Sequence, residues 1–143
     1  MFKRLAIGVV CLGCVATLYG AAVKIRVFVP TTGSEEEALG ADGMAVFNFV
    51  AGQNTTEAQI TLTEFQPNTT YNVWVAGNPA SAPGSLTTNA SGNGHLHMSG
   101  LIGDLTTSPI TVYVGFDGDD ADGFDPTSPG NNDDVRAIGT YTP

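Results

Sequence analysis

Short runs of β-branched and aromatic residues alternate with clusters of Gly, Pro, Asn, Asp and Ser along most of the chain. This pattern is typical of strands joined by turns. One run alternates in polarity, with Ala58, Ile60 and Leu62 on one face and polar residues between them, as in a strand with one buried face. The pattern predicts strands over 23–29, 43–50, 57–63, 70–76, 84–88, 94–99, 110–116 and 135–141.

Helical signals are confined to residues 34–39, where Ser34 could cap a short turn that Gly40 ends. The predicted fold class is therefore all-β. Many short strands at regular turn spacing favour a single antiparallel β-sandwich of about eight strands over a small barrel.

The first 22 residues have the organisation of a secretory signal peptide. Lys3 and Arg4 precede an apolar run over 5–18, and small residues follow at 20–22. The run is shorter than the ~20 residues that a permanent membrane helix needs. We therefore expect cleavage after Ala22, which leaves a β-sandwich domain over 23–143, no integral membrane span, and a secreted or extracytoplasmic location (periplasm or cell surface). The alternative is lipidation at Cys14.

Removal of the leader changes both the thiol content and the charge of the chain. Cys11 and Cys14 are the only cysteines, so the mature domain has neither a disulfide nor a thiolate ligand. It keeps three Lys and Arg residues against 14 Asp and Glu, a net charge of −11. Such a charge repels nucleic acid and anionic membranes, so the expected partners are cations or a neutral protein or carbohydrate surface.

One stretch, in which residues 65–75 alternate, resembles the tyrosine corner of fibronectin type III and other immunoglobulin-like sandwiches. It consists of Ile60, Leu62, Phe65, Pro67, Thr69, Tyr71, Val73 and Val75. The resemblance implies an immunoglobulin-like sandwich in which the Tyr71 hydroxyl reaches back to a backbone group. Three more predicted strands follow Thr88, so the topology must differ from the family or carry additions. An ordinary Pro-Asn turn is the alternative.

The segment between the last two predicted strands is rich in acids, and seven of the 14 lie there. Such crowding is relieved by water, salt or a bound cation, and calcium prefers flexible sets of oxygen ligands. The spacing does not fit an EF-hand, because Ala121 and Phe124 fall where oxygen ligands are needed. We expect an irregular calcium loop, or else a solvated acidic loop. Its candidate ligands are Asp117, Asp119, Asp120, Asp122, Asp125, Asp133 and Asp134.

The only histidines, His95 and His97, alternate with Leu96 and Met98 in a predicted strand, so the two imidazoles should share the solvent face. They are candidate copper or zinc ligands, although a strong site needs a third ligand. Trp74 faces away from Tyr71 and Val73, which makes it a candidate exposed platform for carbohydrate or peptide.

No nucleophile elbow or zinc-protease helix motif occurs in the sequence, so no enzyme activity is predicted. The sequence predicts an exported, non-catalytic binding or cell-surface structural module, with calcium as a stabilising ion. The alternative is a small extracytoplasmic copper- or zinc-binding protein.

Overall fold

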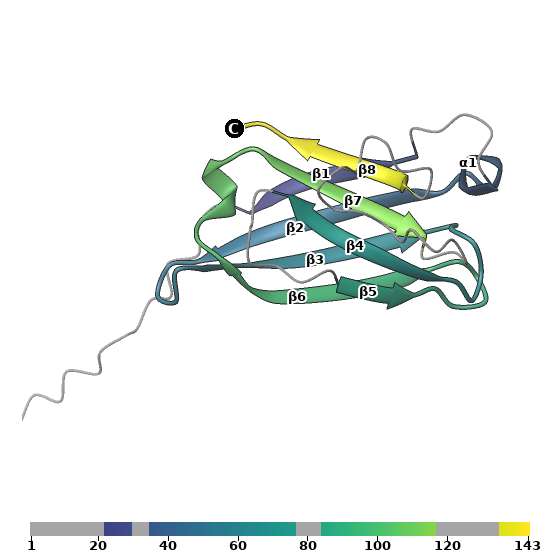
Figure 1. The fold of residues 1–143 in the computed structure, drawn as a ribbon, viewed down its shortest axis with the longest axis horizontal. Helices are drawn as coiled ribbons and strands as arrows, with labels where there is room; N and C mark the ends of the chain where they lie inside the picture. Colours follow the sequence, from purple (N-terminus) through teal and green to yellow (C-terminus); the bar gives the residue numbers. More distant parts are fainter. Residues whose placement is uncertain (1–21, 30–34, 77–83, 117–134) are drawn as a thin grey trace, which may run out of the picture.

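The computed structural model describes residues 22–29, 35–76, 84–116 and 135–143 (Figure 1). All eight predicted strands are confirmed, and β3 and β6 are longer than expected. A five-residue helix, α1, replaces the expected turn. In chain order the elements are β1 (Val23–Phe28), α1 (Glu35–Leu39), β2 (Asp42–Val50), β3 (Thr55–Thr63), β4 (Thr70–Ala76), β5 (Gly84–Thr87), β6 (Gly94–Ile102), the 3-10 turn η1 (Leu105–Thr107), β7 (Ile110–Phe116) and β8 (Val135–Tyr141).

The strands form one antiparallel sheet in the order β5-β4-β7-β8-β1-β2-β3-β6. The sheet folds back on itself, so that β4, β5, β7 and β8 lie in front of β1, β2, β3 and β6 in Figure 1. The two halves are joined where β1 meets β8, through the single register pair Phe28 and Ile138. The fold is thus all-β and antiparallel as predicted, and its eight strands form one nearly closed, barrel-like sheet.

The edge strands β5 and β6 close the structure by side-chain packing. A Cβ atom added to Gly84 would lie 2.5 Å from Cδ2 of Leu96, and one added to Gly94 would overlap Cδ1 of Leu86. Each leucine therefore covers a glycine of the opposite strand. No hydrogen-bonded pairing of β5 with β6 occurs among the described residues, so the two edges of the sheet meet through these leucine side chains.

The core lies between the two halves. The predicted inward positions of β3 are fully buried, and so are the inward residues of the facing strands. This face brings together Val27, Phe47, Ala58, Ile60, Leu62, Tyr71, Val73, Val112, Val114 and Ala137, all with no exposed surface. Every strand except the short β5 and the edge strand β6 supplies a fully buried side chain, and Leu105 of η1 joins the same core.

The predicted tyrosine contact is present. The backbone N–H of Gln66 donates a hydrogen bond to the Tyr71 hydroxyl over 3.2 Å. The Tyr71 ring is fully buried and meets the Phe65 ring edge to face, with centroids 5.2 Å apart. The turn before β4 is therefore fastened both by a hydrogen bond and by an aromatic pair.

Candidate functional site

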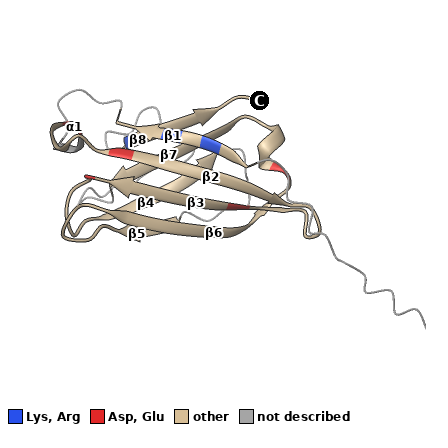
Figure 2. Ribbon diagram, turned by 180° about the vertical axis from the view of Figure 1, so that it is seen from behind, with Lys and Arg blue, Asp and Glu red and all other residues tan. Residues whose placement is uncertain are grey.

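Strands β1, β2, β3 and β6 lie side by side on one side of the molecule (Figure 2), and we call the surface formed by their outward side chains the outer face. Strand alternation builds it, because every second residue of each strand faces solvent. The register places these residues in rows across the strands. One row is Arg26, Met44, Thr61 and His95, and the next is Lys24, Val46, Gln59 and His97.

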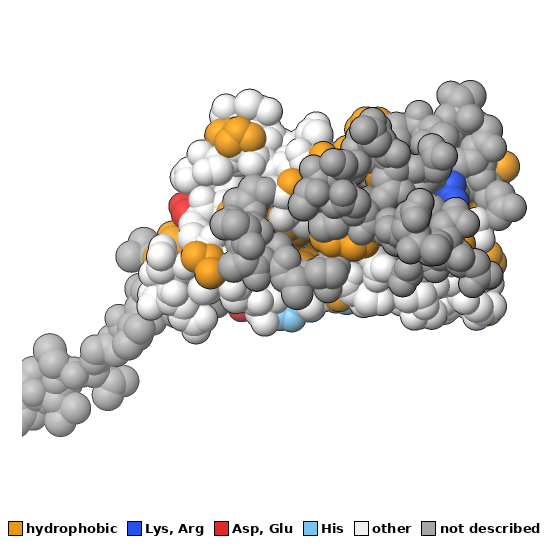
Figure 3. Space-filling view, viewed as in Figure 1, with side chains coloured by type: hydrophobic (Ala, Val, Ile, Leu, Met, Phe, Trp, Pro, Cys, Tyr) orange, Lys and Arg blue, Asp and Glu red, His pale blue; other side chains and the backbone are white. Residues whose placement is uncertain are grey.

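Both histidines are exposed on β6, as predicted from the alternation. Met98 is buried, and Leu96 is partly buried against the core. In the space-filling view a histidine surface emerges at the lower edge of the molecule, where β6 runs (Figure 3). The two imidazoles are thus available to solvent ligands without any change in the core.

Glu57 lies beside His97 on the outer face, a contact that was not predicted from the sequence. Its Oε2 is 3.8 Å from His97 Nε2, with the side chains 41% and 49% exposed. This distance allows an ion pair when the imidazole is protonated, but it is longer than a hydrogen bond. The register between β3 and β6 shifts between Thr56 and Ala58, at the position of Glu57. The strand alternation does place Glu57 on the solvent face, but the sequence does not reveal that β6 is the neighbour of β3.

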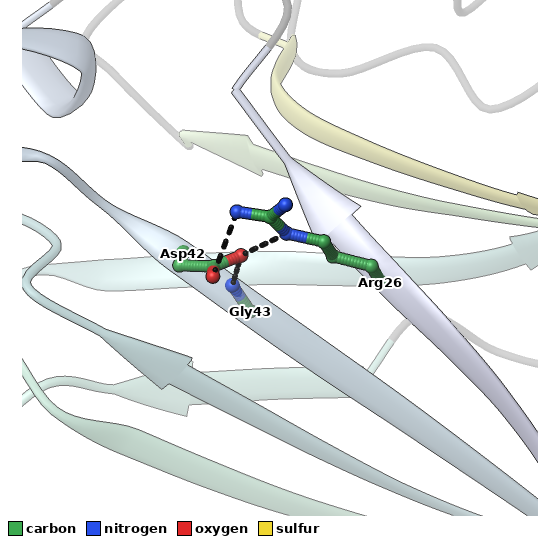
Figure 4. A network of polar contacts seen from close by, with 3 residues as sticks. All are labelled: Arg26, Asp42 and Gly43. Atoms are coloured by element: carbon green, nitrogen blue, oxygen red, sulfur yellow. Dashed lines mark hydrogen bonds and ion pairs between the residues drawn. The ribbon is translucent and has the colours of Figure 1, made fainter.

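A second polar contact joins β1 to β2 on the same face (Figure 4). Arg26 donates two hydrogen bonds to Asp42, from Nε to Oδ1 and from Nη2 to Oδ2, each 3.1 Å long. The N–H of Gly43 donates to Asp42 Oδ1 over 2.9 Å. The hydrogen bond from Arg26 is the main cause of the lowered pKa of Asp42, which partial burial opposes. The same hydrogen bond raises the pKa of Arg26 above its ordinary value.

Apolar side chains are also exposed on the outer face. Phe28 is 49% exposed and Met44 is 48% exposed. They occupy neighbouring rows, because Phe28 is paired with Asp42 and Arg26 with Met44. Such diagonal neighbours on one sheet face lie within reach of each other. The Arg26–Asp42 pair spans the other diagonal of the same four positions, so the two apolar side chains flank this ion pair.

The predicted calcium ligands lie outside the described residues: Asp117, Asp119, Asp120, Asp122, Asp125, Asp133 and Asp134. The structure describes the strand ends on either side, and Gly115 of β7 is paired there with Val135 of β8. The predicted leader also lies outside the described residues, apart from Ala22, and with it Cys11 and Cys14.

Trp74 is not the exposed platform that was considered from the sequence. It does point away from the main core, but only 8% of its surface is exposed. It forms a second, small cluster with Val135, against which Tyr113 and Ile138 pack. Tyr113 lies on β7, and Val135 and Ile138 lie on β8. The order β4-β7-β8, which the sequence does not reveal, therefore places these three side chains beside Trp74.

Comparison with known proteins finds no match: no family model, curated protein sequence or solved structure is similar to this chain. In the described part of the chain, three or more His, Cys, Asp or Glu side chains nowhere gather in an arrangement ready to hold a metal ion. None of the helices in the described ranges has both the length and the apolar character to cross a membrane.

Proposed function

We propose that the chain is an exported, non-catalytic module that acts through the outer face. It either binds a neutral protein or carbohydrate surface or serves as a structural part of the cell surface. The observation that carries the proposal is the half-exposed pair Phe28 and Met44 at the surface of a sparsely charged sheet (Figure 2). Exposed apolar side chains grouped with polar ones are a common feature of binding surfaces.

The distribution of charge supports a neutral partner. The chain has a net charge of −9, yet seven of its 14 acids fall in the single connection between β7 and β8. On the outer face Asp42 is paired with Arg26, and Glu57 lies beside His97. A partner that docks on this face therefore meets little net charge, and desolvation of Phe28 and Met44 favours its binding.

We assign the finer fold to the immunoglobulin-like sandwich type. Two observations support this assignment. Four strands lie on each side of the core, and the halves are linked by one register pair. The Tyr71 hydroxyl also makes the backbone contact that is typical of a tyrosine corner.

Binding is tested by sedimentation with insoluble polysaccharides such as cellulose, chitin and peptidoglycan. The full chain should be retained by at least one polymer, and Phe28→Ser combined with Met44→Ser should abolish retention. Ile102→Ser is the matched control, because Ile102 of β6 is 60% exposed but is paired with Thr55, at the end of the sheet opposite to Phe28. Equal retention of the double variant and the native protein would exclude the outer face as the binding surface.

Export is tested by the mass of the protein recovered outside the cytoplasm. Cleavage after Ala22 gives a chain that begins at Val23, whereas lipidation gives a heavier species that begins at Cys14. Recovery of the intact 143-residue chain only inside the cell would contradict export.

In the same proposal, calcium stabilises the module through the acids between β7 and β8. The thermal midpoint should rise by several degrees between excess EGTA and millimolar calcium, because an ion that binds only the folded state stabilises it. Asp119→Asn with Asp122→Asn should remove the rise. An unchanged midpoint in the native protein would leave this segment as a solvated acidic loop.

A further inference from the structure

We infer that two copies of the chain associate through the edges of β5 and β6, with β6 of one copy pairing antiparallel to β6 of the other. These strands are the two ends of the sheet order, and they lie together along the lower edge of the molecule in both Figure 1 and Figure 2. Strand β6 is separated from β1, which carries Phe28, by two strands, and from β2, which carries Met44, by one. The inference therefore does not depend on the proposed polysaccharide or protein partner.

Strand β6 is the longer of the two edges. On one side, Gly94–Met98 is paired without interruption with residues 58–62 of β3. On its other side no described strand is hydrogen-bonded to it. Half of the N–H and C=O groups of a strand point to each side, so β6 presents a row of backbone donors and acceptors at the sheet edge. Water can satisfy single groups, but the ligand that matches the whole row is another extended backbone.

This side of the molecule carries no charged residue. The sequence has no Lys, Arg, Asp or Glu from Phe65 to Gly103, although the chain has 14 acids and a net charge of −9. Both edge strands lie within this stretch. Lys and Pro commonly protect sheet edges from pairing, and neither occurs from Gly84 to Ile102. The mutual repulsion of two acidic chains is therefore smallest where these edges meet.

A second copy matches both edges at once. Leu86 of β5 and Leu96 of β6 pack against glycines of the opposite strand, which holds the two edges next to each other. A two-fold axis perpendicular to the sheet makes the two β6 strands antiparallel and keeps both outer faces on the same side. The same rotation brings the two β5 strands toward each other. A single peptide strand adds to only one edge, so the paired edges favour a second copy as the occupant.

The apolar side chains at this edge are less completely covered than those further inside the sheet. Leu96 is only partly buried and Met98 is 9% exposed. Ile60 and Leu62, on the neighbouring strand β3, have no exposed surface. A strand added beside β6 covers the remaining apolar surface of Leu96 and Met98, and its removal from water favours association.

The histidines of β6 face each other in such a dimer, because opposite residues of an antiparallel pair point to the same face. An axis at Leu96 places His95 of one copy opposite His97 of the other. An axis at His97 places the two His97 side chains opposite each other. Lysine at both positions therefore puts like charges opposite each other in either register, which destabilises the pairing.

The test is analytical ultracentrifugation of the full chain over a dilution series at neutral pH. A reducing agent prevents disulfides through Cys11 and Cys14. The native chain should show twice the 14.8 kDa mass of one chain at high concentration and should dissociate on dilution. Hydrogen exchange at both ends of the series locates the contact, since the amides of β6 should exchange more slowly in the dimer.

Two matched double variants test the edge. His95→Lys with His97→Lys should weaken the dimer by about tenfold. Gln59→Lys with Thr61→Lys is the control, because these exposed residues of β3 are paired with His97 and His95 and add the same charge one strand inside the edge. The control should dimerise as the native chain does. Circular dichroism checks that each variant is folded.

A single-chain mass at every concentration up to about 1 mM would overturn the inference. Equal dimerisation of the two lysine variants would overturn it too, and so would a dimer in which the amides of β6 gain no protection. Phe28→Ser with Met44→Ser should still dimerise. Failure of the edge contact and failure of the proposed binding module therefore give different results.

Discussion

The Tyr71 hydroxyl accepts a hydrogen bond from the backbone N–H of Gln66, 3.2 Å away, and thereby ties the turn at Pro67 to the start of β4. The same turn is held from the other side by Thr88, whose hydroxyl donates to the carbonyl oxygen of Gln66 and accepts from the N–H of Thr69. The side chains of Tyr71 on β4 and of Thr88, which follows β5, thus satisfy polar backbone groups of this turn.

Tyr71→Phe keeps the buried ring and removes the hydroxyl. It should lower the free energy of unfolding by about 1–2 kcal/mol, because the N–H of Gln66 loses its partner in a partly buried place. Urea unfolding measures the change. An unchanged midpoint would show that the hydroxyl does not fasten the turn.

Thr56 makes a second buried polar link, between β3 and the segment after β6. Its hydroxyl donates to Gly103 O over 2.7 Å and accepts from Leu105 N over 3.1 Å, and the residue is fully buried. Thr56→Val should cost about 2–4 kcal/mol, because both backbone groups lose their partner. Thr61→Val, on the exposed face of the same strand, is the control and should change urea unfolding little. Similar effects of the two substitutions would contradict the assignment.

The strands were predictable because each signal is local. The alternation of Ala58, Ile60 and Leu62 sets which face of β3 is buried, and turn residues mark both ends of most strands. The reach of the Tyr71 hydroxyl also follows from a short stretch of sequence. A period of two residues fixes the face of every side chain on its own strand, including that of Glu57.

Strand order was not predictable, since it depends on contacts between residues far apart in the sequence. The pairing of β3 with β6 brings Glu57 to His97, and the order β4-β7-β8 places Tyr113 and Ile138 beside Trp74. The closing of β5 onto β6 depends on Leu86 and Leu96 lying over glycines of the opposite strand. No pattern of residues within a single strand predicts any of these contacts.

Gly139 permits the approach of β8 to β1. A Cβ atom at this position would lie 2.8 Å from the carbonyl oxygen of Arg26 and 2.8 Å from Cγ2 of Ile25. Gly139→Ala should therefore lower stability by about 1–3 kcal/mol, because the backbone of β1 must move. Gly52→Ala is the control, since an added Cβ there meets nothing within 4 Å. Thermal unfolding of both variants is the measurement. Equal midpoints would show that an added methyl group fits between β8 and β1 without moving either strand.

The Arg26–Asp42 pair should give stability that depends on pH. The pKa of Asp42 is lowered in the folded state, mainly by the hydrogen bond from Arg26, so the folded chain binds its proton less readily than the unfolded chain. The contribution is complete above the ordinary carboxyl pKa of 3.8 and is lost as the pH falls through the lower folded-state value. Asp42→Asn and Arg26→Gln should each reduce stability slightly at neutral pH and flatten its fall below about pH 4. Both effects should shrink in high salt, because the pair is exposed. Urea unfolding between about pH 6 and about pH 2 measures them, and an acid-induced loss that is as steep in both variants as in the native chain would contradict the role of the pair.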